Sequence, residues 1–351
     1  MSITKVAKLA GVSTCTVSRV INGVENVSAQ TVNRVQRAMD KIGYTPLPPE
    51  LRRGPSVAGR TKKAGMTQSK YIAVLILAKG TFYETGGFCR LMRGINNAAA
   101  KENLLTTFDY ISNSEVPHHF SDKNNFRNLL GVITVWGEPS GALAKALQDI
   151  PVVNISSRES STGDIAMVGS ELIGRMAANY LFEKGCKHVA FLNPLYHHPG
   201  YRARCEGFNY FMFTNNIKTE QLNDESISPL KLYDLNINDV KAKTILLLEK
   251  LVSVKPLPQG LFLPNDRITS IAYSWFEQND IKPNRDILIV SSDDEQNFHN
   301  YTNAPAVVSV KSEDVGQNAV EQLLIHSKTP DISSQIQVIM KPQMINPGAF
   351  K

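Results

Sequence analysis

The sequence predicts a small all-α headpiece followed by an α/β body of two doubly wound parallel-sheet subdomains. Short amphipathic helical patterns fill residues 1–46. From residue 71 onward, apolar strand-like segments alternate with amphipathic helical segments, which is typical of parallel sheets covered by helices on both faces. That series is too long for one sheet, and a chain of 351 residues is long enough for two or three domains.

The segment from Thr4 to Val24 contains two helical patterns separated by a turn at Gly11-Val12. Apolar side chains recur at i, i+3 and i+4 in both patterns, first as Val6, Leu9 and Ala10 and then as Val17, Val20 and Ile21. Ser13 is placed to cap the second helix, and Asn22-Gly23 is placed to end it. We therefore expect a helix-turn-helix in this segment.

The outward face of the second helix is polar. It carries Thr14, Cys15, Ser18, Arg19 and Asn22. A second helix with polar groups at its N-terminal end is typical of a helix-turn-helix that reads DNA. The alternative, a helical hairpin inside a bundle, requires an apolar face where this one is polar. A third helix is expected after the cap residue Ser28, with its apolar stripe on Val32, Val35, Met39 and Ile42.

The net charge of +6 is concentrated at the N-terminus. Residues 1–63 contain eleven Lys and Arg but three Asp and Glu, so they carry +8 and the remainder carries −2. A basic head on a faintly acidic body indicates a polyanion bound at the N-terminus, since Lys and Arg supply most of non-specific DNA affinity. Residues 47–70 are rich in Pro, Gly and basic side chains, and we expect a linker there.

The body is predicted to form two similar lobes. The first takes residues 71–160 and 293–325, and the second takes residues 161–292 and 326–346. Strands are expected at 71–77, 104–110, 131–136, 151–156, 166–169, 188–193, 230–234, 260–265, 287–292, 307–311 and 335–340, and helices at 88–101, 171–184, 202–214, 237–251, 266–279 and 313–327. Ligands of such folds lie beyond the carboxyl ends of the strands. Aromatic, carboxylate and amide side chains follow several of these strands, a set that suits a polyhydroxylated ligand.

Several other classes of protein are disfavoured. No apolar run approaches the roughly eighteen residues of a membrane span, and we expect no secretory signal. Four scattered cysteines indicate reduced thiols in the cytosol. The His118-His119 and His197-His198 pairs lack metal-ligand spacing, so neither a metal nor another cofactor is expected.

The segment AGVSTCTVSRVINGVENVSAQTVNRVQRAMDKIGYTP is very similar to the headpiece of the lactose-repressor (LacI/GalR) family of bacterial transcription regulators. The body resembles the family more weakly, through PLY…RARCEGF, FLPNDRIT and IVSSDDEQN. The resemblance implies a periplasmic-binding-protein-like body with a small-molecule effector between its lobes. It also implies a cytoplasmic homodimer on double-stranded DNA, at a pseudo-palindromic operator, with no membrane partner.

The resemblance assigns roles to residues of the headpiece and linker. Base-reading positions fall on Thr14, Cys15 and Arg19, with Ser18 and Asn22 beside them. Phosphate-contacting positions fall on Ser13, Thr16, Ser28 and Thr31. The family's minor-groove wedge corresponds to Leu51, although Gly54-Pro55 permits only a one-turn hinge helix. Cys15 is a departure, because a thiol is a weak hydrogen-bond partner. Either it contacts a thymine methyl group, or the position simply tolerates a small residue.

The resemblance also implies an effector site. Its expected residues are Phe82, Tyr83, Trp136, His198, Arg204, Asn265 and Asp293. A sugar is the expected effector, because hydroxyl groups suit Asp and Asn partners. The family's usual C-terminal ending is replaced here by MINPGAFK.

Two other classes of function remain. A transport-type binding protein shares the two-lobed body, but the basic headpiece argues against it. An enzyme such as a sugar-phosphate transferase needs a phosphate loop, a nucleophile elbow or a metal cluster, and none is recognisable. Asp293-Asp294 is an adjacent carboxylate pair, but neighbouring residues at a strand end point to opposite sides.

Overall fold

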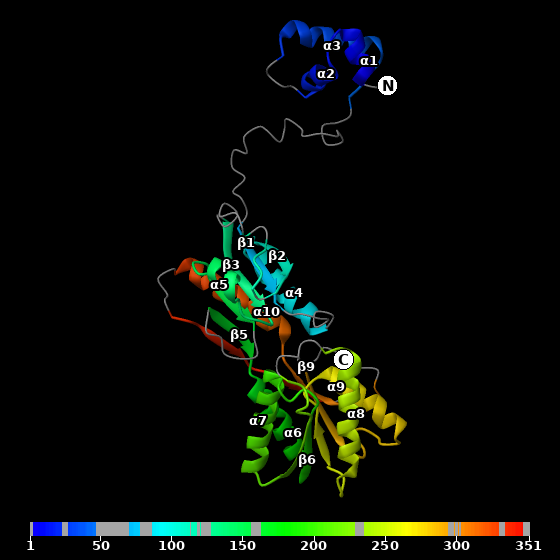
Figure 1. Cartoon of the computed structure of the whole chain (residues 1–351), viewed down its shortest axis with the longest axis vertical. Coiled ribbons are helices and arrows are strands. Elements are labelled where there is room, and N and C mark those ends of the chain that lie inside the picture. The colour runs from blue at the N-terminus through cyan, green and yellow to red at the C-terminus, as the bar shows by residue number, and fades with distance from the viewer. Residues whose placement is uncertain are drawn as a thin grey trace. The chain divides into compact units, whose positions relative to one another are not determined.

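The fold was analysed in a computed structural model of the chain (Figure 1). The structure describes residues 3–22, 27–46, 70–77, 86–112, 114–117, 120, 128–155, 163–228, 235–293, 298, 301, 303–329 and 334–346. The chain divides into two compact units, Met1–Gln68 and Ser69–Lys351. Each unit is described by itself. Residues 47–69 of the predicted linker, including Leu51, lie outside the described residues.

The described residues of the first unit form three helices: α1 (Ile3–Ala10), α2 (Thr14–Ile21) and α3 (Ala29–Lys41). Their small core is centred on Val6, Val17 and Val35, which are fully buried. The prediction of three helices is confirmed, including the caps at Ser13 and Ser28. Leu9 was wrongly placed in the core. It is 45% exposed, and Ala7 is buried in its stead, because α1 packs against both α2 and α3 and this turns its buried face toward Ala7.

The second unit contains two six-stranded sheets, each covered on both faces. The first sheet has the order β11-β5-β4-β3-β1-β2. Its strands are β1 (Tyr71–Ile76), β2 (Leu105–Tyr110), β3 (Leu129–Val135), β4 (Val152–Ile155), β5 (Asp164–Val168) and β11 (Gln337–Met340). Helices α4 (Gly86–Lys101) and α10 (Ser312–Lys328) pack together on one face, and α5 (Gly141–Ala146) contributes to the other.

The second sheet has the order β12-β10-β9-β8-β6-β7, with β12 antiparallel. Its strands are β6 (His188–Asn193), β7 (Lys218–Asn223), β8 (Gly260–Phe262), β9 (Leu288–Asp293), β10 (Ala306–Ser309) and β12 (Gln343–Ile345). Helices α6 (Ser170–Glu183) and α7 (Pro199–Thr214) cover one face. Helices α8 (Ile237–Ser253) and α9 (Asp266–Gln278) cover the other (Figure 1). We call each sheet with its helices a lobe.

Three strands belong to the opposite lobe from the one predicted. β5 pairs in parallel with β4 and therefore completes the first sheet. β10 pairs with β9 in the second sheet, and β11 pairs with β5 in the first. The chain thus crosses between the sheets after β5, after β10 and after β11. Apolar periodicity predicts that a segment is a strand, but it carries no information about which sheet the strand joins.

One edge strand was missed. The prediction placed a strand near residues 230–234, which lie outside the described residues, whereas the structure shows β7 at Lys218–Asn223. β7 is a half-exposed edge strand, and its sequence KTEQLN is almost entirely polar. An edge strand can be polar because only one of its neighbours and part of one face bury it.

Candidate functional site

Helix α2 presents a fixed polar face. The Oγ of Ser13 accepts a hydrogen bond from the backbone N–H of Thr16 at 3.1 Å, which caps the helix. Val17 anchors the opposite side because its side chain is fully buried in the core. Thr14, Cys15 and Arg19 are exposed, as a reading function requires. The half-buried Ser18 and Asn22 are joined by an Asn22 Nδ2 to Ser18 Oγ hydrogen bond of 3.4 Å.

The helices α2 and α3 begin with the same arrangement of hydroxyl groups. Ser13 and Thr16 lie with their side-chain oxygens 2.9 Å apart, and Ser28 and Thr31 repeat that distance. In both cases the serine also caps the helix. Helix N-termini attract anions because their first N–H groups are unsatisfied and the helix dipole is positive there. The four residues predicted to contact phosphate therefore lie at two such N-termini.

In the second lobe, Arg204 from α7 reaches the ends of two strands. Its Nη1 lies 2.7 Å from Oδ1 of Asp293 and donates a 2.9 Å hydrogen bond to Oγ of Ser292. The same nitrogen also donates to the carbonyl of Pro264. The side chains of Arg204 and Asp293 are only 9% and 15% exposed. This buried ion pair joins α7 to β9, so two predicted effector residues are in direct contact.

Tyr201 connects two more predicted residues to this pair. Asn265 Nδ2 donates to the Tyr201 hydroxyl at 2.5 Å, while Asn265 Oδ1 caps α9 by accepting from Ile268 N–H. The His198 ring stacks on the Tyr201 ring at 4.1 Å, and the Arg204 guanidinium lies 5.6 Å from the centre of that ring. His198, Arg204, Asn265 and Asp293 therefore form one connected group, which we call the Arg204 cluster together with Tyr201 and Ser292.

The electrostatics of the Arg204 cluster follow from burial. Burial and, to a smaller extent, the nearby Arg204 charge together lower the pKa of His198 to about 3. His198 is therefore neutral at pH 7. Because its Nδ1 accepts from Tyr201 N–H at 3.3 Å, its proton lies on Nε2. Burial raises the pKa of Asp293, and the Arg204 guanidinium opposes that shift.

Two buried donors near these strand ends are unpaired among the described residues. They are Nε of Arg204 and Nδ2 of Asn193, the last residue of β6. A buried unpaired donor costs free energy, so each favours an oxygen acceptor from a ligand or a water. Asp293 also has a φ of 98°. Strain of this kind clusters at binding sites, where the surrounding structure holds it in place.

Trp136 lies at the end of β3 in the first lobe. Its φ is 63°, an outlier for a bulky side chain, and its ring lies 5.2 Å from that of Phe88. Trp136 also packs against the hydrophobic core of the first lobe. Phe82 and Tyr83 fall outside the described residues. The first-lobe half of the predicted effector site therefore stays a prediction.

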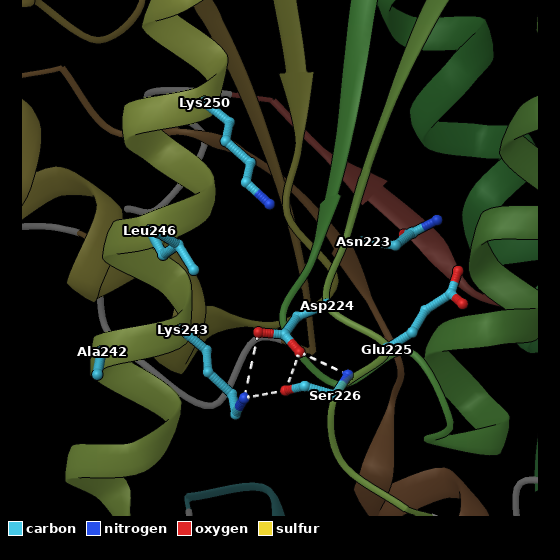
Figure 2. Close-up of a pocket in the computed structure, with 8 residues that line it drawn as sticks. All are labelled: Asn223, Asp224, Glu225, Ser226, Ala242, Lys243, Leu246 and Lys250. Atoms are coloured by element: carbon cyan, nitrogen blue, oxygen red, sulfur yellow. Dashed lines mark hydrogen bonds and ion pairs between the residues drawn. The ribbon is translucent and has the colours of Figure 1, made fainter.

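A separate pocket of about 480 Å³ lies between the end of β7 and α8 (Figure 2). Lys243 Nζ contacts Asp224 Oδ2 at 3.2 Å and Ser226 Oγ at 2.6 Å across its floor. The residues that line it are Asn223, Asp224, Glu225, Ser226, Ala242, Lys243, Leu246 and Lys250. None of the predicted site residues is among them, and its two lysines are offset by two acids. The pocket is therefore distinct from the Arg204 cluster.

Comparison with known proteins identifies both parts of the chain. Residues 2–47 match the family described as "Bacterial regulatory proteins, lacI family", and residues 178–346 match "Periplasmic binding protein-like domain". The HTH-type transcriptional repressor PurR of Vibrio parahaemolyticus is 24% identical over 98% of this chain and 97% of its own length. The ribose operon repressor of Escherichia coli is 25% identical over 98% of both chains. This chain belongs to the LacI family of bacterial regulatory proteins.

Solved structures of LacI-family regulators share the fold of this chain. The lac repressor dimer bound to operator and the anti-inducer ONPF superposes with a TM-score of 0.61 at 18% identity, covering 99% of this chain and 98% of that one. The regulator CelR in complex with cellobiose gives 0.61 at 16% identity over the same shares. An Enterococcus faecium family member with bound ribose gives 0.61 at 17% identity over 78% and 97%. The predicted headpiece and two-lobed body are thus confirmed.

The family assignment bears on the classes of function considered above. LacI-family proteins are DNA-binding transcriptional regulators and not enzymes, so this chain is a transcriptional regulator. The described residues include no helix long and apolar enough to cross a bilayer. Nor do the described residues place three or more His, Cys, Asp or Glu side chains where they would hold a metal ion.

Three residues at this site were not predicted from the sequence: Tyr201 and Ser292 of the Arg204 cluster, and Asn193 at the end of β6. Tyr201 lies three residues after His198 and three before Arg204, so helical spacing alone places it between them. Ser292 directly precedes Asp293 on β9. The sequence gives no signal that Asn193 is fully buried with an unpaired amide, because that depends on the packing of neighbouring strands.

Proposed function

We propose that this LacI-family protein is a transcriptional repressor whose affinity for its operator is set by a sugar bound between the two lobes. The observation that carries the proposal is the coexistence of an exposed, capped reading helix in one unit and the buried Arg204 cluster in the other. In this assignment Thr14, Cys15 and Arg19 read base edges, with Ser18 and Asn22 beside them. Ser13, Thr16, Ser28 and Thr31 contact phosphates.

Arg19 is the main specificity determinant in this proposal. A guanidinium binds the O6 and N7 of guanine with two hydrogen bonds, worth roughly 1–3 kcal/mol of discrimination. Arg19 is exposed and follows Cys15 by four residues, so both side chains lie on the same face of α2. The Cys15 side chain is small and exposed, which suits contact with a thymine methyl group.

A neutral polyhydroxylated effector fits the Arg204 cluster best. The Arg204 charge is already offset by Asp293, so the cluster has no net charge to attract an anion. His198 Nε2, Arg204 Nε and Asn193 Nδ2 offer donors, and the Asp293 carboxylate offers an acceptor. Hydroxyl groups both donate and accept, so a sugar can match this mixture. The ligands bound in two structural relatives, cellobiose and ribose, support the same class.

The repressor is proposed to act as a homodimer in the bacterial cytoplasm. One headpiece offers too few contacts for specific affinity, whereas two headpieces match a pseudo-palindromic operator. The edge strand β2 exposes Phe108 and Tyr110 on one face of the sheet, and a second copy can cover this surface. Leu51, and the first-lobe residues Phe82, Tyr83 and Trp136, complete the proposed DNA and effector contacts.

The effector is proposed to act through a two-state equilibrium of the lobes. It changes operator affinity only by the difference between its affinities for the two states. A thermal-shift screen of neutral sugars, sugar phosphates and nucleobases tests the ligand class, because ligand that binds the folded state raises the unfolding temperature. A shift with a neutral sugar that disappears in Arg204→Ala supports the proposal. Shifts confined to phosphates or nucleobases contradict the assignment of a sugar.

A further inference from the structure

Helix α7 carries an exposed stripe that no part of the described chain covers. Tyr210 and Phe213 are 64% and 81% exposed, the two highest values among the large apolar side chains that the structure describes. Arg202 and Glu206 precede them on the same helix and are also exposed. The spacings of four, four and three residues place all four side chains along one face. We call these four residues the α7 stripe.

The end of α7 that carries the two exposed aromatic residues is fixed by hydrogen bonds. α7 ends in ordered structure, with Thr214 Oγ1 donating to the Phe211 carbonyl at 2.9 Å and Asn215 Nδ2 donating to it at 2.8 Å. Ile217 N–H then bonds to the Met212 carbonyl at 2.9 Å. Phe211 itself packs edge-on against Phe182 of α6. The exposure of Phe213 therefore belongs to the folded helix and does not arise from a frayed end.

The α7 stripe is complementary to a copy of itself. In an antiparallel pair of α7 helices centred near residue 208, Arg202 of each helix lies opposite Phe213 of the other. Within one helix Arg202 and Phe213 are about 16 Å apart, so the two contacts lie at opposite ends of the pair. A guanidinium over an aromatic face is a favourable pair. Glu206 of each helix likewise meets Tyr210 of the other, whose O–H can donate to the carboxylate. At one end the stripe has an Arg202–Glu206 ion pair of 3.3 Å, and at the other it has two aromatic rings.

From this complementarity we infer that the α7 stripe is a second self-association surface, through which two dimers of this protein form a tetramer. α7 covers the opposite face of the second sheet from α8 and α9, and it belongs to a different lobe from β2. The stripe is therefore free when a copy covers β2. One helix pair buries less than the 1,200 Å² or more of a stable interface, so the contact is weak between separate dimers. It becomes effective where two dimers bind one DNA molecule and raise their local concentration.

Sedimentation velocity of the full-length protein over a range of concentrations tests this interface without DNA or effector. We expect the wild-type chain to sediment as a dimer at low concentration and increasingly as a tetramer at high concentration. Phe213→Asp should weaken tetramer formation at least tenfold, and so should Arg202→Glu, because each places a like or unpaired charge against the partner helix. Arg202→Lys keeps the cation and should weaken tetramer formation less than Arg202→Glu does.

A matched control is Ile325→Asp, which adds the same charge at an exposed apolar position of α10 in the first lobe. It should leave tetramer formation unchanged. All three substituted positions are surface positions, and an unchanged unfolding temperature verifies that each of the four variants folds. The inference is overturned if the wild-type protein shows no species larger than a dimer, or if Phe213→Asp and Arg202→Glu form the tetramer as well as the wild type. Loss of the dimer itself in Phe213→Asp also overturns it, because the stripe would then be part of the primary interface.

Discussion

The guanidinium of Arg204 lies 2.7 Å from the carboxylate of Asp293, and this pair joins α7 to the end of β9 inside the second lobe. A buried ion pair gains Coulomb energy but loses the hydration of both ions, so its net contribution is small. Removing one partner is different, because it leaves an uncompensated buried charge. The pair is thus suited to a site where a ligand adds hydrogen bonds to groups that the protein already holds in place.

The first prediction concerns this pair. Asp293→Ala should lower the free energy of unfolding by about 3–5 kcal/mol, because Arg204 then stays buried without its counter-charge. The double variant Arg204→Ala with Asp293→Ala should lose less than the sum of the two single variants. Urea unfolding of the three variants measures the difference. Strict additivity would show that the two side chains do not interact.

His198 provides a prediction about pH. Its pKa is lowered from 6.5 to about 3, so the folded protein binds fewer protons than the unfolded chain between those values. Stability must therefore fall as pH falls below 6.5, by at most about 2 kcal/mol between pH 6.5 and pH 5. His198→Asn keeps a capping side chain for α7 but removes the titration, and should flatten this part of the curve. An unchanged slope in urea unfolding across that range would contradict the neutral state of His198 in the folded protein.

A third prediction concerns the contact between α6 and α7. A Cβ added at Gly174 would collide with the carbonyl oxygen of Arg204, so the two backbones touch where Arg204 is held. Gly174→Ala should lower the free energy of unfolding by about 1–3 kcal/mol through overpacking. Without such a collision, Ala would stabilise the helix interior relative to Gly by about 1 kcal/mol. The sign of the change in unfolding free energy therefore shows whether the two backbones touch. A more stable Gly174→Ala variant in urea would refute the close contact.

The cap of α3 provides a fourth prediction. Ser28→Ala should destabilise α3 by about 1 kcal/mol, and Ser28→Asp should not, because aspartate also caps helices well. If the α3 N-terminus contacts phosphate, Ser28→Asp should still weaken DNA binding by adding a negative charge there. Hydrogen exchange of the α3 amides measures the first effect, and fluorescence anisotropy with duplex DNA measures the second. Ser274→Asp on α9 is a charge control that should leave DNA affinity unchanged. Equal DNA affinity of Ser28→Asp and wild type would remove Ser28 from the interface.

The sequence predicted the headpiece well because its helices are short, local and marked by side chains that cap them. Ser13 and Ser28 accept the predicted bonds, and Val17 and Val35 are buried as expected. The body was harder, since pairing partners are distant in sequence. The assignment of β5 and β10 to the wrong sheets shows this, because nothing in either segment encodes its neighbour.

The effector site shows the same contrast between local and long-range information. Arg204 and Asp293 were placed through local motifs, and the structure brings them together. The fully buried, unpaired Asn193 amide follows from packing across strands, which no local pattern reveals. Tyr201 could be predicted only in part. The spacing of α7 places it beside His198, but its hydrogen bond to Asn265 joins α7 to α9, which local spacing does not reveal.

The central claim is that α2 reads DNA through Arg19. Sequences selected from a random duplex pool by the full-length protein provide the probe, and anisotropy compares the selected duplex with a scrambled one. We predict that the wild-type protein prefers the selected duplex by at least a thousandfold, as specific DNA-binding proteins do. Arg19→Ala should lose most of that preference while keeping weak, salt-sensitive binding to both duplexes, and the exposed Arg175→Ala on α6 should behave as wild type. An Arg19→Ala protein that retains the full preference would contradict the account.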